Sequence, residues 1–374
     1  MTDRASRLRI AFVVHDYNRH GGQNRYVVEL ATRFKRNHEV HVFANTFDDH
    51  DLDGIACHRV PALRTNSLSS ALSFILPATI LARGEYDIVH SQGLCGLSHN
   101  FATAHMCQPA WYKALADEGN LFTWKQQLYR RLVSRLERRA LCQAATRRVV
   151  AVSNRMKADL SQHYGRSEHV DVVYHGTDVE TFHPENRDRF GSEARDSLGI
   201  PRAAFAALYV GDLKKGVAAA IKAVAMTPGV HLVVLTASKF KFAQRLAETE
   251  GVGHRVLFRP HTKNIERCFA AADVFLFPTV YDSFGMVITE AMASGLPVIV
   301  SAAAGASELV TSGVDGFVNE RSWDVPLIAK QLAELRDDRG LRERVGAQAR
   351  RRIEPMTWQR TADETLQSYK LALA

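Results

Sequence analysis

Hydrophobic runs of strand length alternate with amphipathic segments of helical period along most of this chain. The segment 23–36 has the apolar spacing of an amphipathic helix and follows the first such run. In the first half of the chain, this pattern predicts buried strands at 9–16, 39–45, 86–92, 147–153 and 170–176. Strands that alternate with helices indicate parallel βαβ units.

The same alternation starts again in the second half. A polar stretch that contains proline, 177–196, separates the halves and is predicted to be a domain linker. A helix is predicted at 215–226, and strands are predicted at 205–211, 231–237, 255–261, 273–279, 297–302 and 316–320. The sequence therefore predicts an α/β protein with two Rossmann-like, doubly wound domains facing each other across a cleft. Ligands of such domains bind at the carboxyl ends of the strands.

Composition agrees with this picture and adds a charge. The chain has 374 residues, of which 46% are hydrophobic and 24% are charged, as in ordinary globular proteins. Its five cysteines have no CxxC or CxH spacing, which favours reduced thiols in a cytoplasmic protein over disulfides or a zinc site. The apolar run 71–82 is too short to span a bilayer and is predicted to be a buried helix. The net charge of +8 indicates an anionic partner.

The segment 281–301, YDSFGMVITEAMASGLPVIVS, carries the strongest functional pattern. Gly285 opens a predicted helix, and backbone N–H groups at a helix start suit phosphate oxygens. Glu290 lies about one turn further in, where it can accept hydrogen bonds from two ribose hydroxyls. Asp282 lies on the preceding loop and can meet the sugar or the diphosphate. The residues of this segment predicted to bind a nucleotide-sugar donor are Ser283, Phe284, Gly285, Met286, Val287 and Glu290.

Two further glycine turns each follow a predicted strand. In YVGDLKKGVAAAIKAV, Gly211 is followed by Lys214 and Lys215, which can direct positive charge at a leaving diphosphate. Gly21 and Gly22 follow the first strand and let the backbone approach a phosphate or sugar closely, because no Cβ intervenes. This pair lacks the GxGxxG spacing of a dinucleotide oxidoreductase. The alternative for the two lysines is an ordinary solvated loop.

Together these segments resemble the retaining GT-B glycosyltransferases of family 4 (glycosyl transferases group 1), and the chain is similar to lipopolysaccharide-core hexosyltransferases. Asp282 stands where the family has the first of two glutamates, and Glu290 matches the second. Lys215 matches the lysine of the family's GRLxxxKG segment, but Asp212 replaces its usual arginine. In FATAHMCQPAWYK, His105 matches the histidine that family members place beside the donor hexose.

The resemblance also implies the domain limits and the absence of a metal. It implies an acceptor-side domain at 1–180, a nucleotide-sugar domain at 181–355, and a final helix at 356–374 that returns to the first domain, anchored by Trp358 and Leu366. GT-B enzymes resemble one another in using backbone dipoles and cations instead of a metal. The Asp51-Leu52-Asp53 string is therefore interpreted as chance, and no cofactor or metal site is expected.

The stretch from Lys125 to Arg148 is strongly basic. Leu128, Leu132, Leu136 and Ala140 recur every four residues and are expected to form one packed face. The nearby aromatic residues Trp111, Tyr112 and Trp124 suit the surface of an anionic membrane. The alternative is a solvated helix face. No nucleic-acid partner is expected, because no recognised binding module accompanies the charge.

The sequence thus predicts a metal-independent, retaining transferase that moves a hexose from a nucleotide sugar, UDP-linked in our interpretation, to a glycan or lipid-linked glycan such as lipopolysaccharide core. The predicted catalytic residues are His105, Lys215, Asp282 and Glu290. We expect the protein to lie in the cytoplasm. If the basic stretch contacts the membrane, the protein would be peripheral on the inner face of the cell membrane. A nucleotide-sugar epimerase of the same fold and a non-catalytic nucleotide-sugar-binding protein are the alternatives.

Overall fold

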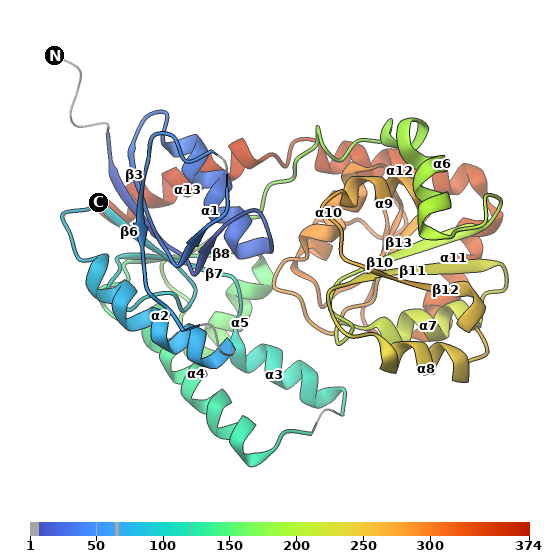
Figure 1. The fold of residues 1–374 in the computed structure, drawn as a ribbon, viewed down its shortest axis with the longest axis horizontal. Helices are drawn as coiled ribbons and strands as arrows, with labels where there is room; N and C mark the ends of the chain where they lie inside the picture. The colour runs from blue at the N-terminus through green and yellow to red at the C-terminus, as the bar shows by residue number, and fades with distance from the viewer. Residues whose placement is uncertain (1–6, 50, 64–66, 120) are drawn as a thin grey trace. The chain divides into compact units, whose positions relative to one another are not determined.

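The computed structural model describes residues 7–49, 51–63, 67–119 and 121–374. The chain divides into two compact units, one of residues 1–176 with 358–374 and the other of residues 177–357. The boundaries at 180 and 355 that we expected from the sequence lie a few residues from these limits. Both units are parallel α/β sheets with helices on both faces (Figure 1).

The first unit contains a seven-stranded parallel sheet in the order β5-β3-β1-β6-β7-β8-β9, and a two-stranded ribbon of β2 and β4. Its strands are β1 (Arg9–Val13), β2 (Asp16–Tyr17), β3 (Glu39–Ala44), β4 (Thr46–Phe47), β5 (Ile55–Arg59), β6 (Ile88–Gln92), β7 (Phe101–Ala104), β8 (Arg148–Ala151) and β9 (Val170–Val172). Its helices are α1 (Gly22–Phe34), α2 (Ser67–Leu81), α3 (Gln108–Asp117), α4 (Trp124–Cys142), α5 (Asn154–Tyr164) and α13 (Trp358–Leu373).

Successive side chains of β1 serve opposite faces of this sheet, as the strand period requires. Ala11 and Val13 join a cluster with residues of α2, including Phe74. Phe12 lies instead in contact with Phe34 of α1, at 6.2 Å between ring centroids. Because both faces of the strand are covered, its apolar run is continuous in the sequence.

The second unit contains a six-stranded parallel sheet in the order β12-β11-β10-β13-β14-β15. Its strands are β10 (Phe205–Val210), β11 (Val230–Thr236), β12 (Val256–Pro260), β13 (Val274–Phe277), β14 (Val298–Ser301) and β15 (Phe317–Asn319). Its helices are α6 (Asn186–Leu198), α7 (Val217–Ala225), α8 (Lys241–Thr249), α9 (Ile265–Ala271), α10 (Met286–Ala293), α11 (Val325–Asp337) and α12 (Arg339–Ile353), with short 3-10 helices η1 (Gly253–Arg255) and η2 (Gly305–Leu309).

The linker prediction for 177–196 was wrong in its second part, because α6 begins at Asn186. Its polar composition hides a packed face, formed by Gly191, Ala194 and Leu198. A Cβ on Gly191 would lie 3.1 Å from the carbonyl oxygen of Ala270 on α9, so the glycine lets the two helices approach closely. Tertiary packing, rather than the helix's own composition, therefore stabilises α6.

The buried helix predicted at 71–82 is present as α2, but only part of its surface is buried. On α2, Phe74, Ile75 and Ala78 are buried, whereas Leu76 and Ile80 are exposed. Among the described residues, none of the helices combines the length and the apolar composition that crossing a bilayer requires.

The predicted packed stripe on the basic helix α4 was wrong in its first half. Leu128 and Leu132 are exposed, and the buried residues are Val133, Glu137, Ala140 and Leu141. A spacing of four residues advances a helix by about 40° more than one full turn. Leu128 and Ala140 are therefore separated by about 120° and cannot share a face.

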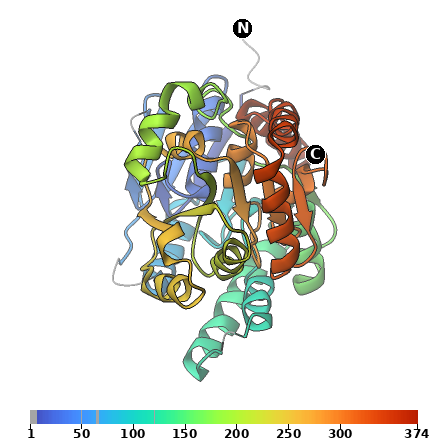
Figure 2. The same ribbon diagram turned by 90° about the vertical axis from the view of Figure 1, so that its right-hand side faces the viewer.

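The helices α3 and α4 form a hairpin that projects from the sheet of the first unit (Figure 2). The connection between them ends at Thr123, whose side chain and that of Gln126 cap the start of α4 reciprocally. The final helix α13 packs on α1 and β8 of the same unit. Trp358 is buried as expected, but Leu366 is only partly buried, and Tyr369 is the fully buried residue further along the helix.

Candidate active site

The strand order of the second unit identifies one edge where a ligand site is expected. The chain runs from β10 outward through β11 to β12, and then returns to β13 on the other side of β10. The loops after β10 and β13 therefore diverge at a topological switch point, where open α/β sheets bind ligands. Lys215 follows β10 and Asp282 follows β13, so the sequence motifs lie on these two loops.

An ion pair joins these two loops. The Nζ atom of Lys215 lies 2.6 Å from Oδ2 of Asp282, and both side chains retain partial exposure. The other carboxylate oxygen, Oδ1, accepts a hydrogen bond from the backbone N–H of Phe284 at 3.2 Å. Both side-chain oxygens of Asp282 are thus directed, one to the lysine and one to the turn that precedes α10.

The backbone of Asp282 is also held on both sides. Its N–H donates to the carbonyl of Ala303, and its own carbonyl accepts from the N–H of Gly305, both at 3.0 Å. These contacts tie the loop after β13 to the loop after β14. The carboxylate is therefore fixed by a rigid frame, as a group that positions a lysine requires.

Gly216 shows why the sequence after Lys215 must be a glycine. Its φ is 97°, and a Cβ on it would lie 1.8 Å from the carbonyl oxygen of Pro278, which follows β13. The two loops of the switch point therefore touch through bare backbone at this residue, directly beside Lys215.

The helix α10 begins where the sequence predicted. Gly285 precedes it with φ 90° and ψ 61°, a left-handed conformation that favours glycine. The first N–H groups of a helix have no carbonyl partner inside it, so the start of α10 offers donors and the positive end of the helix dipole. The predicted donor-binding residues Ser283, Phe284, Met286 and Val287 surround this start.

Glu290 lies on α10 and is only 6% exposed. A carboxylate this deeply placed is unusual outside a functional or paired setting. Its neighbour Thr289 accepts a hydrogen bond from Thr177 at 2.8 Å, which fixes the helix against the start of the second unit.

Tyr209, near the end of β10, contacts the loop after this strand and was missed by the sequence analysis. The hydroxyl of Tyr209 donates to the carbonyl of Asp212 at 2.7 Å, and burial together with the charges of Asp212 and Asp282 raises the pKa of Tyr209 well above its usual range. Asp212, which stands in place of the family's arginine, accepts a hydrogen bond from the N–H of Lys214 at 2.8 Å. It therefore shapes the turn, and Lys214 is exposed to solvent.

In the first unit, His105 directly follows β7, at the carboxyl end of that strand. Its Nε2 lies 2.8 Å from Oε1 of Gln92, so it donates to that amide oxygen. Burial, and then the neighbouring His175 and His90, lower the pKa of His105 well below its usual value. The ring is therefore neutral at pH 7 and can exchange hydrogen bonds without carrying charge.

The glycine pair lies at the corresponding switch point of the first sheet, between β1 and β6. The short strand β2 intervenes between β1 and Gly21, so the pair does not directly follow β1 as expected. Gly21 has φ 78°, and α1 begins at Gly22. Gln92, at the end of β6, connects this loop to His105, because its backbone carbonyl also accepts from Gln23 at 3.3 Å. Sequence reasoning missed Gln92, although its place at a strand's carboxyl end was a usable signal.

The structure thus gathers Lys215, Asp282, Phe284 and Glu290 in the second unit, and Gly22, Gln92 and His105 in the first. In the part of the chain that the structure describes, no group of three or more His, Cys, Asp or Glu residues is arranged to hold a metal ion. Asp51 of the DxD string lies 2.5 Å from Nζ of Lys35.

Two doubly wound units, each with glycine turns and polar side chains at its switch point, define the architecture of GT-B glycosyltransferases. Comparison with known families is consistent with this class. Residues 20–181 match the model of Glycosyltransferase Family 4, and residues 191–352 match that of Glycosyl transferases group 1. Together the two models span most of the chain, and the chain belongs to the glycosyltransferases that they describe. This membership favours a transferase over the epimerase alternative.

Individual relatives extend over nearly the whole chain. D-inositol 3-phosphate glycosyltransferases from Mycobacterium marinum and Mycobacterium ulcerans are each 28% identical to it, covering 94% of this chain and 82% of their own. Among solved structures, WaaG, a glycosyltransferase involved in lipopolysaccharide biosynthesis, superposes with a TM-score of 0.80 at 22% identity, covering 95% of this chain and 98% of its own. HepE from Anabaena, in complex with UDP and glucose, gives 0.73 at 20% identity, covering 97% and 99%.

Proposed function

We propose that the protein transfers a hexose from a UDP-linked donor to a glycan or lipid-linked glycan, with retention of the anomeric configuration and without a metal. The observation that supports this most directly is the Lys215–Asp282 pair, at the switch point and beside the start of α10. A cation held next to the start of a helix is the arrangement that a leaving diphosphate requires.

The donor would lie along α10. Its diphosphate would lie over the helix start near Phe284 to Val287 and accept hydrogen bonds from the amides of Met286 and Val287. Its ribose hydroxyls would donate to the carboxylate of Glu290. The choice of UDP rests on HepE, which shares the fold and was solved with UDP and glucose.

Lys215 would stabilise the charge that develops as the diphosphate leaves. Asp282 positions the ammonium group, because its own backbone and Oδ1 are held by three hydrogen bonds. A fixed cation needs little reorganisation during the reaction, and such electrostatic stabilisation contributes roughly 3–4 kcal/mol in comparable sites.

The first unit would supply the acceptor side. Neutral His105 can hydrogen-bond a hexose hydroxyl and orient the anomeric carbon. In a front-face reaction, the bond between that carbon and the diphosphate breaks while the acceptor oxygen bonds to the same carbon. The proton of the acceptor hydroxyl passes to the leaving phosphate.

The exposed part of α4 would contact an anionic membrane surface where a lipid-linked acceptor is presented. Leu128 and Trp124 are exposed beside the arginines of this helix, a combination that suits the interface between water and lipid.

A donor panel tests the proposed reaction. Purified protein would be incubated with UDP-, GDP- and ADP-linked hexoses, and free nucleotide and calorimetric binding would be measured. We expect binding and slow release with one UDP-sugar, both weakened by Glu290→Gln and retained in Glu248→Gln, an exposed acid on α8. Absence of binding to every donor would contradict the proposal, and an inverted product by NMR would contradict retention.

A further inference from the structure

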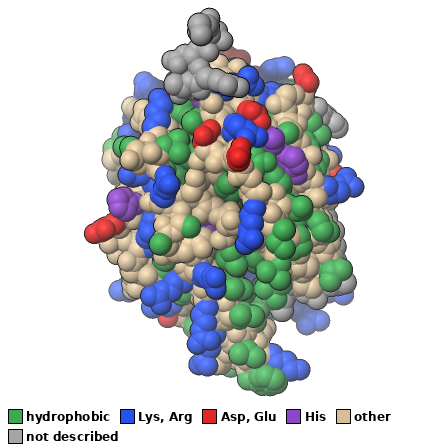
Figure 3. Space-filling view, turned by 90° about the vertical axis from the view of Figure 1, so that its left-hand side faces the viewer, with side chains coloured by type: hydrophobic (Ala, Val, Ile, Leu, Met, Phe, Trp, Pro, Cys, Tyr) green, Lys and Arg blue, Asp and Glu red, His purple; other side chains and the backbone are tan. Residues whose placement is uncertain are grey.

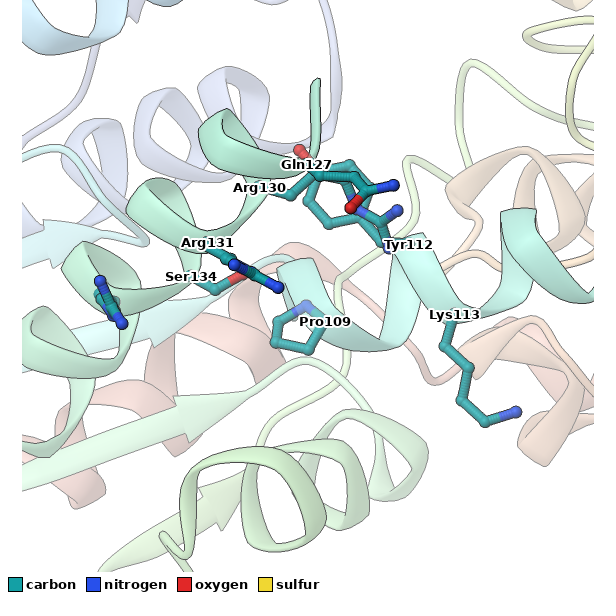
Figure 4. A pocket seen from close by; sticks show the side chains of 8 residues that line it. Pro109, Tyr112, Lys113, Gln127, Arg130, Arg131 and Ser134 are labelled. Atoms are coloured by element: carbon teal, nitrogen blue, oxygen red, sulfur yellow. The ribbon is translucent and has the colours of Figure 1, made fainter. Parts of the chain in front are cut away.

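A pocket of about 470 Å³ opens between α3 and α4, and its lining includes none of the residues assigned to the donor. This is within the size range of small-molecule sites. Figure 4 shows Arg130 of α4 beside Tyr112 of α3, and Lys113 extending outward from α3. Its polar lining consists of Lys113 from α3 and Gln127, Arg130, Arg131, Ser134 and Arg135 from α4.

The lining is positively charged and contains no carboxylate. Among the described residues, Arg131 and Arg135 form no ion pair or hydrogen bond, so their guanidinium groups keep all their donors. Lys113 contacts Asp117 at 2.6 Å, but both side chains of this pair are more than half exposed. Exposed pairs of this kind are weak, so Lys113 can exchange that partner for a ligand.

Arg130 is already held in place by aromatic rings. Its guanidinium carbon lies 4.0 Å from the ring centroid of Phe122 and 4.3 Å from that of Tyr112. These contacts join the two helices near the tip of the hairpin and orient the arginine, because the faces of aromatic rings attract cations. The position of Arg130 in the pocket is thus fixed by the protein itself.

Large apolar side chains stand exposed on the same hairpin. Leu121, Trp124, Leu128 and Leu132 are 96%, 70%, 62% and 44% exposed. Figure 3 shows hydrophobic side chains beside Lys and Arg on the projecting part of the first unit. An arginine-lined pocket beside such a face suits a ligand whose anionic group is attached to an apolar chain.

We propose that this pocket binds the phosphomonoester group of an anionic lipid headgroup. A phosphomonoester presents three terminal oxygens and nearly two negative charges, and guanidinium groups bind it in bidentate fashion. A phosphodiester offers fewer oxygens and one charge. The pocket therefore distinguishes between anionic lipids, beyond the general attraction of a basic helix to a charged surface. This inference rests on the proposed membrane contact of α4.

Co-sedimentation of the full-length protein with vesicles tests it. Phosphatidylcholine vesicles would contain either phosphatidic acid, a phosphomonoester, or phosphatidylglycerol, a phosphodiester, in proportions that give equal surface charge. We expect about tenfold tighter binding to phosphatidic acid, as one additional charge-assisted contact provides.

Two double variants separate the pocket from net charge. Arg131→Ala with Arg135→Ala should abolish the preference for phosphatidic acid. Arg138→Ala with Arg139→Ala removes the same charge from exposed positions of α4 outside the pocket, and should weaken binding to both vesicles while leaving the preference intact. The midpoint of urea unfolding would show that all variants fold.

The outcomes are distinct. Equal binding of wild type to both vesicles, or equal loss in both double variants, would overturn the pocket while leaving the membrane contact standing. No binding to either vesicle would overturn both. Glycerol phosphate serves as a soluble phosphomonoester without an apolar chain. If the protein bound it as tightly as the vesicles, the lipid assignment would be overturned. The nucleotide-sugar panel is independent of all three results.

Discussion

Gly216 is the residue where the packing of the candidate site is most demanding. Alanine there would have to adopt φ 97° and would place its Cβ 1.8 Å from the carbonyl oxygen of Pro278. We expect Gly216→Ala to lower the free energy of unfolding by roughly 2–4 kcal/mol, since backbone strain and a backbone clash add. Urea unfolding measures this loss.

Gly229 offers the matched control for that substitution. It has φ 79°, but nothing lies within 4 Å of the position of its Cβ. Gly229→Ala should therefore cost only roughly 1–2 kcal/mol, from the left-handed backbone alone. Equal losses in the two variants would contradict the close contact between the two loops.

Part of the candidate site could be predicted from the sequence at the scale of single residues. The spacing between Asp282, Gly285 and Glu290 is local, because one turn and one short helix carry all three. Gln92 was missed because only the fold brings its partners His105 and Gln23 near. Tyr209 was missed for another reason: its partner Asp212 is only three residues away, but a buried strand pattern does not show that the hydroxyl turns back to that carbonyl. Asp212 likewise shows its turn-shaping contact with Lys214 only in three dimensions.

At the scale of elements, Glu137 joins α3 to α4. This buried carboxylate of α4 accepts hydrogen bonds from the hydroxyl of Tyr164 and from the N–H of Gln108 at the start of α3, the latter at 2.8 Å. Burial raises the pKa of Glu137 from 4.5 to about 7. The folded state thus holds this proton more tightly than the unfolded chain does, so the stability contributed by Glu137 falls as pH rises from about 4.5 to about 7.

Glu137→Gln should remove this dependence, because an amide does not titrate in this range. The free energy of unfolding of the variant, relative to that of wild type, should therefore increase as the pH is raised from 5 to 8. Urea midpoints measured across this range would show the increase. Glu168→Gln, at an exposed position of the same unit, should show no such trend. A constant difference between Glu137→Gln and wild type across this range would contradict the raised pKa.

The final helix α13 gives a second prediction at this scale. The hydroxyl of its buried Tyr369 lies 2.7 Å from Nδ1 of His90 on β6. Tyr369→Phe would leave that ring nitrogen buried without its partner, and should lower the free energy of unfolding by roughly 1–3 kcal/mol. Lys370 is the next residue and is exposed, so Lys370→Ala should change the free energy of unfolding little. Thermal or urea unfolding would measure both variants. A neutral Tyr369→Phe substitution would show that this hydrogen bond does not hold α13 in place.

Helices and strands were predictable where their burial leaves a local pattern of apolar residues in the sequence. The central strands β1, β10 and β13 are continuous apolar runs because both faces of each sheet are covered. The edge strand β5 was missed because three of its five residues are exposed, so neither a continuous apolar run nor a regular alternation marks it in the sequence. The helix α6 was mistaken for linker because its packed face consists partly of glycine and alanine, whose small size carries weak periodic signal.

At the scale of the whole chain, the repeated βαβ pattern predicted two doubly wound units, and the structure confirms them. Their strand orders could not be read from the sequence, because alternation alone does not say where the chain reverses across a sheet. The reversal between β10 and β13 is what brings Lys215 to Asp282. The central claim is therefore that this pair forms part of a donor site.

The most direct measurement is the rate of nucleotide release from the preferred donor by Lys215→Ala, beside Lys222→Ala as control. Lys222 carries the same charge in the same unit but is exposed on α7. We expect a fall of roughly 10²–10³ in kcat for Lys215→Ala, since a fixed charge at the leaving group is lost, and wild-type rates for Lys222→Ala. Unchanged kcat in Lys215→Ala, or equal losses in both variants, would contradict the placement of the diphosphate at this ion pair.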